Sequence, residues 1–296
     1  MTMRLQVVLF ALLLLTSCAY DAPGQAGRMV DIGTHALHIR VRGEGAPAVV
    51  VDGGIASRSE EWHALQLRLA EETLAFVYDR AGYGASEPGP LPRDSWREAE
   101  ELKSLLQASA VEGPYVLVGH SLGGLNVQVF AERYPEDVAG MVLLDPPPLG
   151  WLLGENYSGL RAMAEQMTDE WQAIEERGAG SSDPEDRAES DFFRMIASEH
   201  REMLGESARL VAEIETFGNL PLVVIASGVP NPMFGEVAEE YQTYWADQSR
   251  ALADKSGRGE FFLAENSTHR LHEDAADLVL ESILSLVTEA RGHRRD

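Results

Sequence analysis

The segment G-H-S-L-G at residues 119–123 constrains the fold of this chain more than any other part of the sequence. It follows the apolar run 115–118, which is typical of a buried strand, and precedes a helical pattern over 125–134. At such a sharp strand–turn–helix connection a serine is strained, and flanking glycines remove side chains that would clash. The Ser121 hydroxyl would be exposed beside the first N–H groups of a helix, which favour an anion. The pattern predicts a nucleophilic serine. The alternative is a glycine-rich turn with an ordinary surface serine.

Composition limits the classes of protein to consider. The chain has 296 residues, of which 45% are hydrophobic, so it is long enough for one large α/β domain with a full core. Its 24 basic and 48 acidic residues give a net charge of −24. Such a surface repels a phosphate backbone, so no nucleic-acid partner is expected. The sequence has no metal-ligand spacing and no phosphate-binding glycine loop, so it predicts no metal site and no cofactor.

The N-terminus resembles an export signal and not part of a fold. Residues 6–15 form an apolar run that is too short to span a bilayer as a stable helix. The following L-T-S-C at 15–18 resembles the lipobox of a bacterial lipoprotein, and Cys18 is the only cysteine in the chain. The resemblance implies a signal peptide over 1–17, acyl chains on Cys18 and a tether over 18–28. It also implies a cell-envelope location, on the periplasmic side of an outer membrane if there are two membranes. The alternative is an ordinary cleaved signal peptide.

Short apolar runs alternate with amphipathic stretches from residue 29 onward. This alternation is typical of a mainly parallel sheet that is covered by helices on both faces. The predicted strands are 29–32, 36–42, 48–52, 75–78, 115–118, 139–144, 222–226 and 261–263. The predicted helices are 95–110, 125–134, 237–255 and 274–290, with the end of another at 65–72.

Residues 149–218 interrupt this alternation. The segment is acidic and helix-like, and a glycine- and serine-rich stretch breaks it at 178–184. Because it lies between two predicted strands, we expect several helices inserted above the strand ends as a cap over a pocket. Residues 29–148 and 219–291 would then form the core. The alternative is an independent binding module.

With these features together, the chain resembles the α/β-hydrolase superfamily over about residues 29–290. The resemblance rests on G-H-S-L-G-G at 119–124, on D-R-A-G-Y-G-A-S at 79–86 and on a late histidine before the final helix. The chain is similar to the esterase-like branch with a helical cap between the sixth and seventh strands. The resemblance implies an eight-stranded sheet and serine chemistry. Asp79 and Arg80 are expected to be structural, in a buried or half-buried ion pair.

The resemblance also implies a histidine base, because a serine hydroxyl is barely ionised at pH 7. In the family this histidine lies between the last strand and the last helix, where both His269 and His272 occur. His269 has the family spacing, with Asp274 as the expected N-cap of the final helix. His272 resembles a second histidine that has no triad role, and His120 is expected to pack or hydrogen-bond behind the sheet. The other histidines are expected at the surface or in loops: His35, His38, His63, His200 and His293.

The acid of the triad is placed by the same resemblance. In much of the family it follows the seventh strand, but here S-G-V-P-N-P follows at 227–232, with no carboxylate before Glu236. Other members carry the acid at the end of the sixth strand, where Asp145 stands. A carboxylate there would fix the tautomer of His269 and stabilise its charged form. Asp145 is therefore the predicted acid, and Glu236 is the alternative.

Two backbone N–H groups are expected to bind the developing oxyanion. One is that of Leu122, the residue after the serine. The other is implied by the family, in which the loop after the third strand carries His-Gly-x. Here Gly53-Gly54-Ile55 occupies that place, so the N–H group of Ile55 is the candidate.

The complete set predicts a serine hydrolase that acts on carboxylic esters of small or medium-sized molecules through an acyl-enzyme. A serine nucleophile argues against relatives that use aspartate to open epoxides or remove halide. Aminopeptidase, amidase, thioesterase, C–C hydrolase and acyltransferase chemistry stay open, because these activities differ in the cap and the pocket. A hypothesis from another class is a non-catalytic anchored binding protein. The complete Ser/His/Asp set argues against it.

Overall fold

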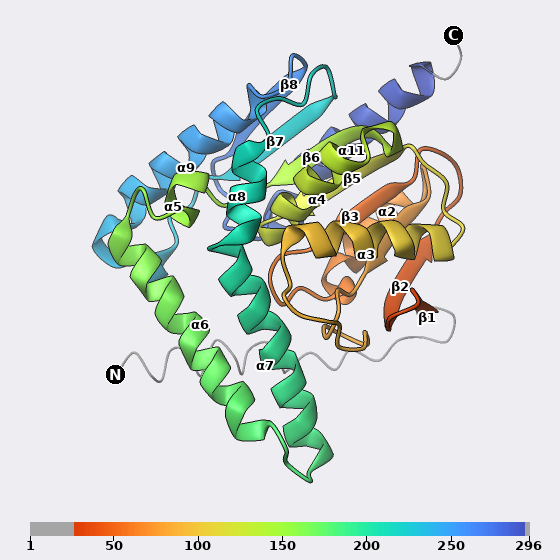
Figure 1. The fold of residues 1–296 in the computed structure, drawn as a ribbon. Helices are drawn as coiled ribbons and strands as arrows, with labels where there is room; N and C mark the ends of the chain where they lie inside the picture. The colour runs from red at the N-terminus through yellow and green to blue at the C-terminus, as the bar shows by residue number, and fades with distance from the viewer. Residues whose placement is uncertain (1–26, 294–296) are drawn as a thin grey trace.

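The computed structural model describes residues 27–293 and places an eight-stranded sheet at the centre of the molecule (Figure 1). The strands are β1 (Arg28–Asp31), β2 (Ala36–Arg42), β3 (Val49–Asp52), β4 (Ala75–Tyr78), β5 (Tyr115–His120), β6 (Val138–Leu144), β7 (Leu222–Ser227) and β8 (Gly259–Ala264). Their order in the sheet is β1-β2-β4-β3-β5-β6-β7-β8. β2 pairs antiparallel with β1 and with β4, and all other neighbouring strands are parallel. The prediction of a mostly parallel eight-stranded sheet is confirmed.

From β3 onward, helices connect most of the strands and cover both faces of the sheet. They are η1 (Ser59–Trp62), α2 (His63–Leu69), α3 (Ser95–Ala108), α4 (Leu122–Arg133), η2 (Pro135–Asp137), α5 (Leu149–Leu152), α6 (Ser158–Gly178), α7 (Pro184–Met203), α8 (Glu206–Glu213), η3 (Pro232–Val237), α9 (Ala238–Ala253), α10 (Leu271–Asp274) and α11 (Ala276–His293). No helix among residues 27–293 is long and apolar enough to cross a membrane.

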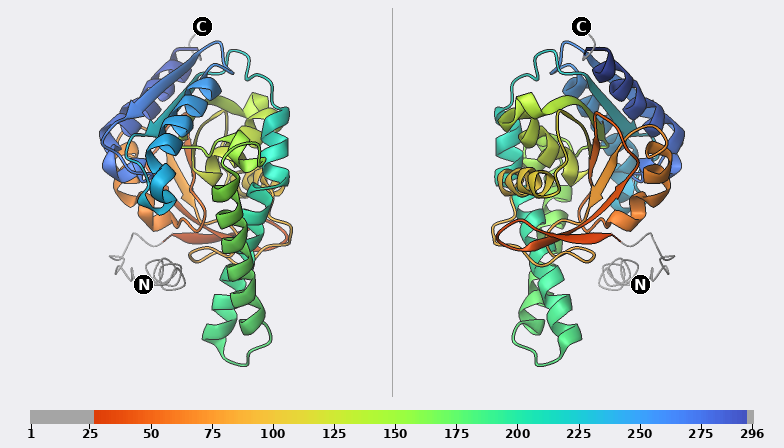
Figure 2. Two further views of the ribbon diagram at one scale, coloured as in Figure 1. Left: turned by 90° about the vertical axis from the view of Figure 1, so that its left-hand side faces the viewer. Right: turned by 90° about the vertical axis from the view of Figure 1, so that its right-hand side faces the viewer.

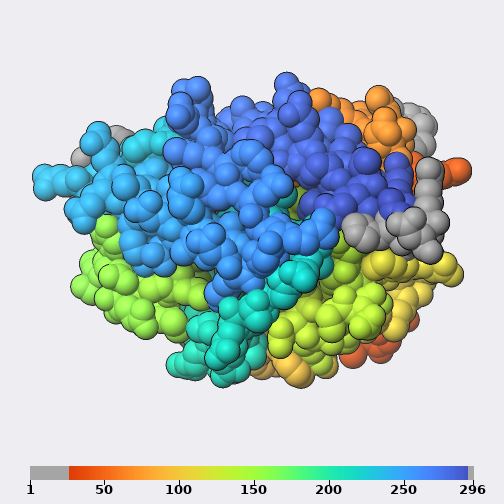
Figure 3. All heavy atoms as spheres, turned by 90° about the horizontal axis from the view of Figure 1, so that it is seen from above, coloured from red at the N-terminus to blue at the C-terminus, as the bar shows by residue number. Residues whose placement is uncertain are grey.

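The sheet divides the interior into two apolar cores. Successive side chains of a strand point to opposite faces, and every residue of β3 is buried. Val50 faces the core that is formed with α3, α4 and α9, whereas Val49 and Val51 face the core that is formed with α2 and α11. This double burial explains why the central strands are continuous apolar runs. Viewed from above, the C-terminal part of the chain (blue) and residues near 130–160 (green) cover opposite sides of the molecule (Figure 3).

Four helices, α5 to α8, are inserted between β6 and β7. The long helices α6 and α7 form an antiparallel hairpin whose free end projects beyond the sheet (Figures 1 and 2). The end of the insertion, in α7 and α8, is fastened to the start of α3 and to the loop before it. The backbone N–H of Arg93 donates to Ser198 Oγ at 3.0 Å, and that of Ser95 donates to Ser207 Oγ at 2.8 Å. One end of the insertion is therefore bound to the core.

The start of the final helix and the placing of three histidines differ from what the sequence predicts. The final helix begins at Ala276 and not beside Asp274, whose carboxylate instead accepts from the backbone N–H of Thr268 at 2.9 Å. Residues 271–274 form the separate short helix α10. Among the histidines expected at the surface, His35, His38 and His200 are buried. The sequence does not show that these histidines are buried. A histidine can lie in a core when distant segments supply its hydrogen-bond partners.

His200 of α7 joins the two hairpin helices. Its Nδ1 lies 2.7 Å from Thr168 Oγ1 of α6, and both residues are buried. Burial, assisted by the nearby charge of Arg161, lowers the pKa of His200 from 6.5 to about 4. Between these two values the unfolded chain binds a proton at this position that the folded protein does not bind. The contribution of His200 to stability is therefore full above pH 6.5 and is lost as the pH falls toward 4.

We expect His200→Asn to remove up to one proton from the pH dependence of unfolding between pH 6.5 and 4. Near the middle of this range the slope should differ from the wild-type slope by about 1.4 kcal/mol per pH unit. Urea denaturation at a series of pH values measures this slope. Thr168→Val removes the same hydrogen bond without removing a titrating group, and should keep the wild-type slope. Equal slopes for H200N and wild type would contradict the assignment.

Candidate active site

The predicted site residues gather at the carboxyl edge of the parallel strands. Ser121 lies between β5 and α4 with φ 53° and ψ −120°, outside the regions that most residues adopt. Its backbone N–H donates to the carbonyl of Leu144, the last residue of β6, at 2.9 Å. Its own carbonyl accepts from the N–H of Gly124 at 2.9 Å. These bonds hold the serine in the strained turn.

The two glycines flanking the serine are required by close contacts. A Cβ on Gly123 would lie 2.2 Å from the carbonyl oxygen of Asp52, at the end of β3. A Cβ on Gly119 would lie 2.5 Å from Cγ2 of Val127 in α4. Real Cβ atoms do not approach other atoms so closely. The spacing of the motif therefore reflects how near α4 comes to β3 and β5.

Asp145 and His269 are joined by a hydrogen bond. His269 Nδ1 lies 2.6 Å from Asp145 Oδ2. The carboxylate is held from its other side by Ser227, whose backbone N–H donates to Oδ1 at 2.9 Å and whose hydroxyl donates to Oδ2 at 2.8 Å. Because a carboxylate accepts hydrogen bonds, Nδ1 is the donor, and the outer nitrogen Nε2 is left with a free lone pair. Such an imidazole can accept a proton.

The surroundings of these two side chains differ. The Asp145 side chain is 3% exposed, whereas that of His269 is 39% exposed. The second candidate acid, Glu236, is exposed in η3. The structure thus pairs His269 with a buried carboxylate that accepts three hydrogen bonds. The oriented imidazole stays accessible from solvent.

His120 links the serine turn to the His269 loop. Its Nε2 lies 2.8 Å from the carbonyl oxygen of His269, and the centroids of the two rings are 4.7 Å apart. Burial is the main cause that lowers the pKa of His120 well below 6.5, and the neighbouring imidazole of His269 adds to the effect. The neutral ring therefore carries its proton on Nε2, and this N–H donates a hydrogen bond to the carbonyl of His269. Ser121 is thus adjacent to a residue that contacts the His269 loop directly.

His272 has no contact with Asp145. Its ring stacks on Trp62, with the ring centroids 4.2 Å apart. Burial lowers its pKa to about 4. A neutral histidine packed against tryptophan agrees with the expectation that His272 lies outside the triad.

The loop after β3 lies against the serine. A Cβ on Gly54 would be 3.3 Å from Ser121 Cβ, and Ile55 is the next residue. Leu122 is the first residue of α4, and the first N–H groups of a helix have no partner within the helix. The structure therefore brings the loop of Ile55 and the start of α4 to the same serine. Backbone donors from two sides of a hydroxyl are suited to a developing negative charge.

Several residues at the site carried no signal in the sequence. Ser227 is one, although it stands where much of the family has its acid. Trp245 of α9 is another, with its ring centroid 5.9 Å from that of His269. Asp79 and Arg80 do not form their expected contact with each other. Asp79 binds His38 Nδ1 at 2.8 Å, whereas Arg80 pairs with other carboxylates. Partners so distant in the chain leave no local pattern.

Cys18 and the predicted signal lie outside the described residues. Among residues 27–293 there is no group of three or more histidine, cysteine, aspartate or glutamate side chains placed to hold a metal ion.

Comparison with known proteins gives a consistent family. Residues 45–282 match the model of the alpha/beta hydrolase family. The Bacillus subtilis protein YqjL is 28% identical over 246 residues, which cover 82% of this chain and 85% of that protein. A 2-(acetamidomethylene)succinate hydrolase from Mesorhizobium japonicum is 33% identical over 121 residues, which cover 41% of this chain and 43% of that enzyme.

The fold is also found in solved structures. A thermophilic esterase from Thermogutta terrifontis superposes with a TM-score of 0.61 at 19% identity, over 89% of this chain and 99% of that one. At this level of identity the likeness extends to the fold alone. The activity of the present chain has to be argued from its own residues.

Proposed function

This chain is a member of the α/β hydrolase family, and we propose that it is a serine hydrolase that cleaves carboxylic esters of small or medium-sized molecules through an acyl-enzyme. The observation that carries the proposal is the hydrogen bond of 2.6 Å between His269 and Asp145, beside the strained turn of Ser121. A nucleophile, a base and an orienting carboxylate, gathered on one sheet edge, are the groups that acyl transfer requires.

In the proposed mechanism, Ser121 Oγ attacks the acyl carbon while His269 Nε2 takes the hydroxyl proton. The tetrahedral oxyanion receives hydrogen bonds from the N–H groups of Leu122 and Ile55. His269 then gives its proton to the leaving alcohol, and the ester bond breaks. Water attacks the acyl-enzyme with the same histidine as base, and the acid is released. Asp145 holds the imidazole in one tautomer throughout and stabilises its charged form.

The site supports an acyl compound as the substrate, and within that class the ester is our proposal. The residue at the nucleophile position is a serine, whose hydroxyl attacks an acyl carbon once a neighbouring base takes its proton. Amide, thioester and acyl-transfer chemistry use the same groups, so substrate panels are needed to separate them. Labelling of Ser121 by a fluorophosphonate probe separates such an enzyme from a non-catalytic binding protein.

We expect Ser121→Ala to abolish labelling by a fluorophosphonate probe and to lower kcat for nitrophenyl esters by about 10⁴-fold or more. Ser104→Ala, which changes a half-buried serine on α3, is the matched control and should label normally. A panel of nitrophenyl esters of increasing chain length, run beside amino-acid anilides, measures the substrate class. Fast release from anilides with little ester turnover would replace the esterase by an amidase. Folded wild-type protein that neither labels nor turns over would indicate a binding protein.

The acid is tested by exchanging the two candidate carboxylates. We expect Asp145→Asn to lower kcat by about 10⁴-fold, because an amide favours the wrong tautomer of His269. Asn still offers an oxygen to the backbone N–H of Ser227, so the fold should persist. Glu236→Gln should keep the wild-type rate. Steady-state kinetics on purified variants measure both effects, and the reverse pattern would transfer the role to Glu236.

Anchoring through Cys18 is a separate part of the proposal. It is supported by the lipobox-like sequence at 15–18 and by the absence of any other cysteine in the chain. In cells fed labelled palmitate, we expect the full-length chain to carry label in the membrane fraction, and Cys18→Ser to lose both label and membrane association. Unlabelled wild-type protein released in soluble form would favour an ordinary cleaved signal peptide.

A further inference from the structure

One buried arginine touches the backbone of the proposed oxyanion loop. The Arg80 side chain is 2% exposed. Its Nη1 donates to the carbonyl of Gly53 at 2.6 Å, and its Nη2 donates to the carbonyl of Gly54 at 2.8 Å. These are the two residues that precede Ile55 in the loop after β3. A guanidinium group therefore holds two successive peptide groups of this loop.

Because the peptide bond is planar, the contact of Arg80 with the Gly54 carbonyl also determines the orientation of the Ile55 N–H. The Gly54–Ile55 bond is not among the cis bonds of the described chain, so it is trans and planar. In a trans peptide the carbonyl oxygen and the N–H of the next residue point in opposite directions. The bond from Arg80 to the Gly54 carbonyl therefore fixes the direction of the Ile55 N–H, which points away from the guanidinium. A flip of this peptide would remove the donor from the proposed oxyanion hole.

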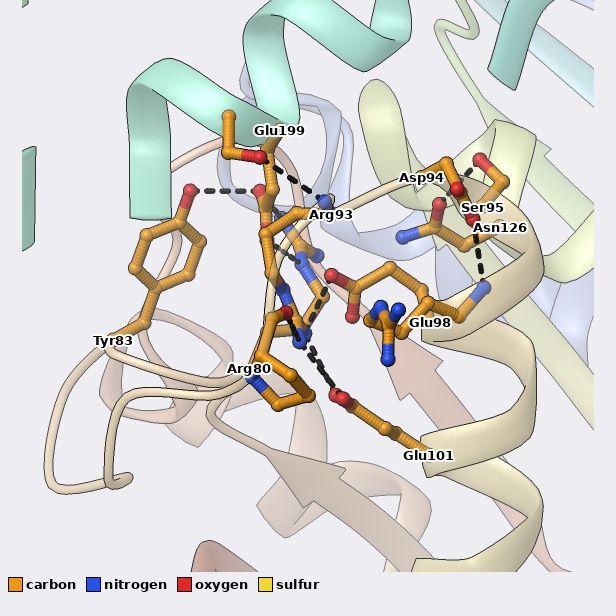
Figure 4. Close-up of polar contacts among 12 residues, drawn as sticks. Arg80, Tyr83, Arg93, Asp94, Ser95, Glu98, Glu101, Asn126 and Glu199 are labelled. Carbon is orange, nitrogen blue, oxygen red and sulfur yellow. Dashed lines mark hydrogen bonds and ion pairs between the residues drawn. The ribbon is translucent and has the colours of Figure 1, made fainter. Parts of the chain in front are cut away.

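Arg80 is itself held by two carboxylates. Asp52, at the end of β3, accepts from Nη1 at 2.5 Å. Glu199, on α7 of the inserted helices, accepts from Nε and Nη2, both at 2.9 Å (Figure 4). With the carbonyls of Gly53 and Gly54, all five N–H donors of Arg80 have an acceptor. The position of the guanidinium is therefore fully determined by its partners.

A second connection runs from Glu199 to the same loop. The hydroxyl of Tyr83 donates to Glu199 Oε2 at 2.7 Å, as Figure 4 shows. Tyr83 also packs in one buried cluster with Ala56, the residue after Ile55, whose backbone N–H acts to lower the pKa of Tyr83. The Glu199 carboxylate thus reaches the residues before and after the Ile55 N–H, through Arg80 on one side and Tyr83 on the other.

We propose that Glu199 and Arg80 are positioning residues that set the oxyanion hole, so that the seating of α7 on the core determines the rate of acyl transfer. The proposal rests on the proposed function. Neither residue contacts the reacting atoms in this scheme. They act by holding the Gly54–Ile55 peptide in the orientation that presents its N–H to the substrate.

A neighbouring ion-pair cluster provides the matched control. Arg93 is buried between Glu98 and Glu101 of α3, with Nη2 2.6 Å from Glu98 and 2.7 Å from Glu101 (Figure 4). Arg93 is also attached to α7, through its backbone N–H and Ser198. This cluster has the same chemistry as the Arg80 cluster, but Arg93 bonds to Ser198, Pro90 and Glu101 and not to residues 53–56. Glu101→Gln therefore changes a buried carboxylate without touching the loop.

The experiment compares Glu199→Gln, Arg80→Lys and Tyr83→Phe with Glu101→Gln. Lysine keeps the charge but has three donors in place of five. We expect kcat to fall by about 100-fold in R80K, about 10-fold in E199Q and a few-fold in Y83F, with KM within about 3-fold of wild type, since a displaced oxyanion donor costs about 10²–10³. E101Q should keep kcat within about 2-fold. Fluorophosphonate titration counts the folded, competent sites, so each kcat refers to folded enzyme.

Inhibition by a trifluoromethyl ketone that carries the acyl group of the substrate gives a second readout. This ketone binds serine as a tetrahedral oxyanion, so its Ki should rise in proportion to the loss of kcat/KM. If the wild-type enzyme is active and E199Q and R80K are no slower than E101Q, the positioning role is overturned and the proposed function stands. An inactive wild type would overturn the proposed function instead. If E199Q and R80K do not fold, Y83F decides, and an unchanged kcat and Ki in Y83F would reject the proposal.

Discussion

The close approach of α4 to the end of β3 is the constraint on which the rest of the site depends. It is possible only because Gly123 has no side chain, since a Cβ there would lie 2.2 Å from the Asp52 carbonyl. The approach forces Ser121 into its strained turn and brings the start of the helix against the loop of Gly54 and Ile55. The strain is balanced by backbone bonds to β6 and by the packed sheet. Because Gly123 has no side chain, the serine and the backbone N–H groups can lie close together.

Much of the architecture could be predicted because it is encoded locally. Continuous apolar runs mark strands that are buried on both faces, and the five residues at 119–123 mark the turn. The pairing of His269 with Asp145 came from resemblance to a family, since 124 residues separate them. Ser227 and Glu199 could not be found from the sequence. Their partners are supplied by segments that only the tertiary fold brings near, and serine and glutamate are ordinary residues at the surface of any helix or loop.

Charge in this protein acts differently at the surface and inside. The net charge of −24 reflects a mostly solvated acidic exterior, which affects solubility and long-range attraction. Asp52 and Glu199 are buried instead, and both share the guanidinium of Arg80. Burial raises the pKa of Asp52, an effect that Arg80 opposes. Buried ion pairs contribute little net stability compared with apolar packing, but they have strict geometric requirements. A cluster of this kind is therefore better suited to fixing an orientation than to strengthening the fold.

The α6–α7 hairpin is fastened at its base and free at its tip. Pro184 begins α7 and Glu199 lies 15 residues later, a separation of about 22 Å along the helix axis. Glu199 follows Ser198, the residue of α7 that is bonded to the core, so the hairpin would bend close to Glu199. A bend at this point would displace the tip much more than the Glu199 carboxylate. The turn at 179–183 can therefore change in length or composition, or touch another surface, while the catalytic geometry stays mechanically insulated from it.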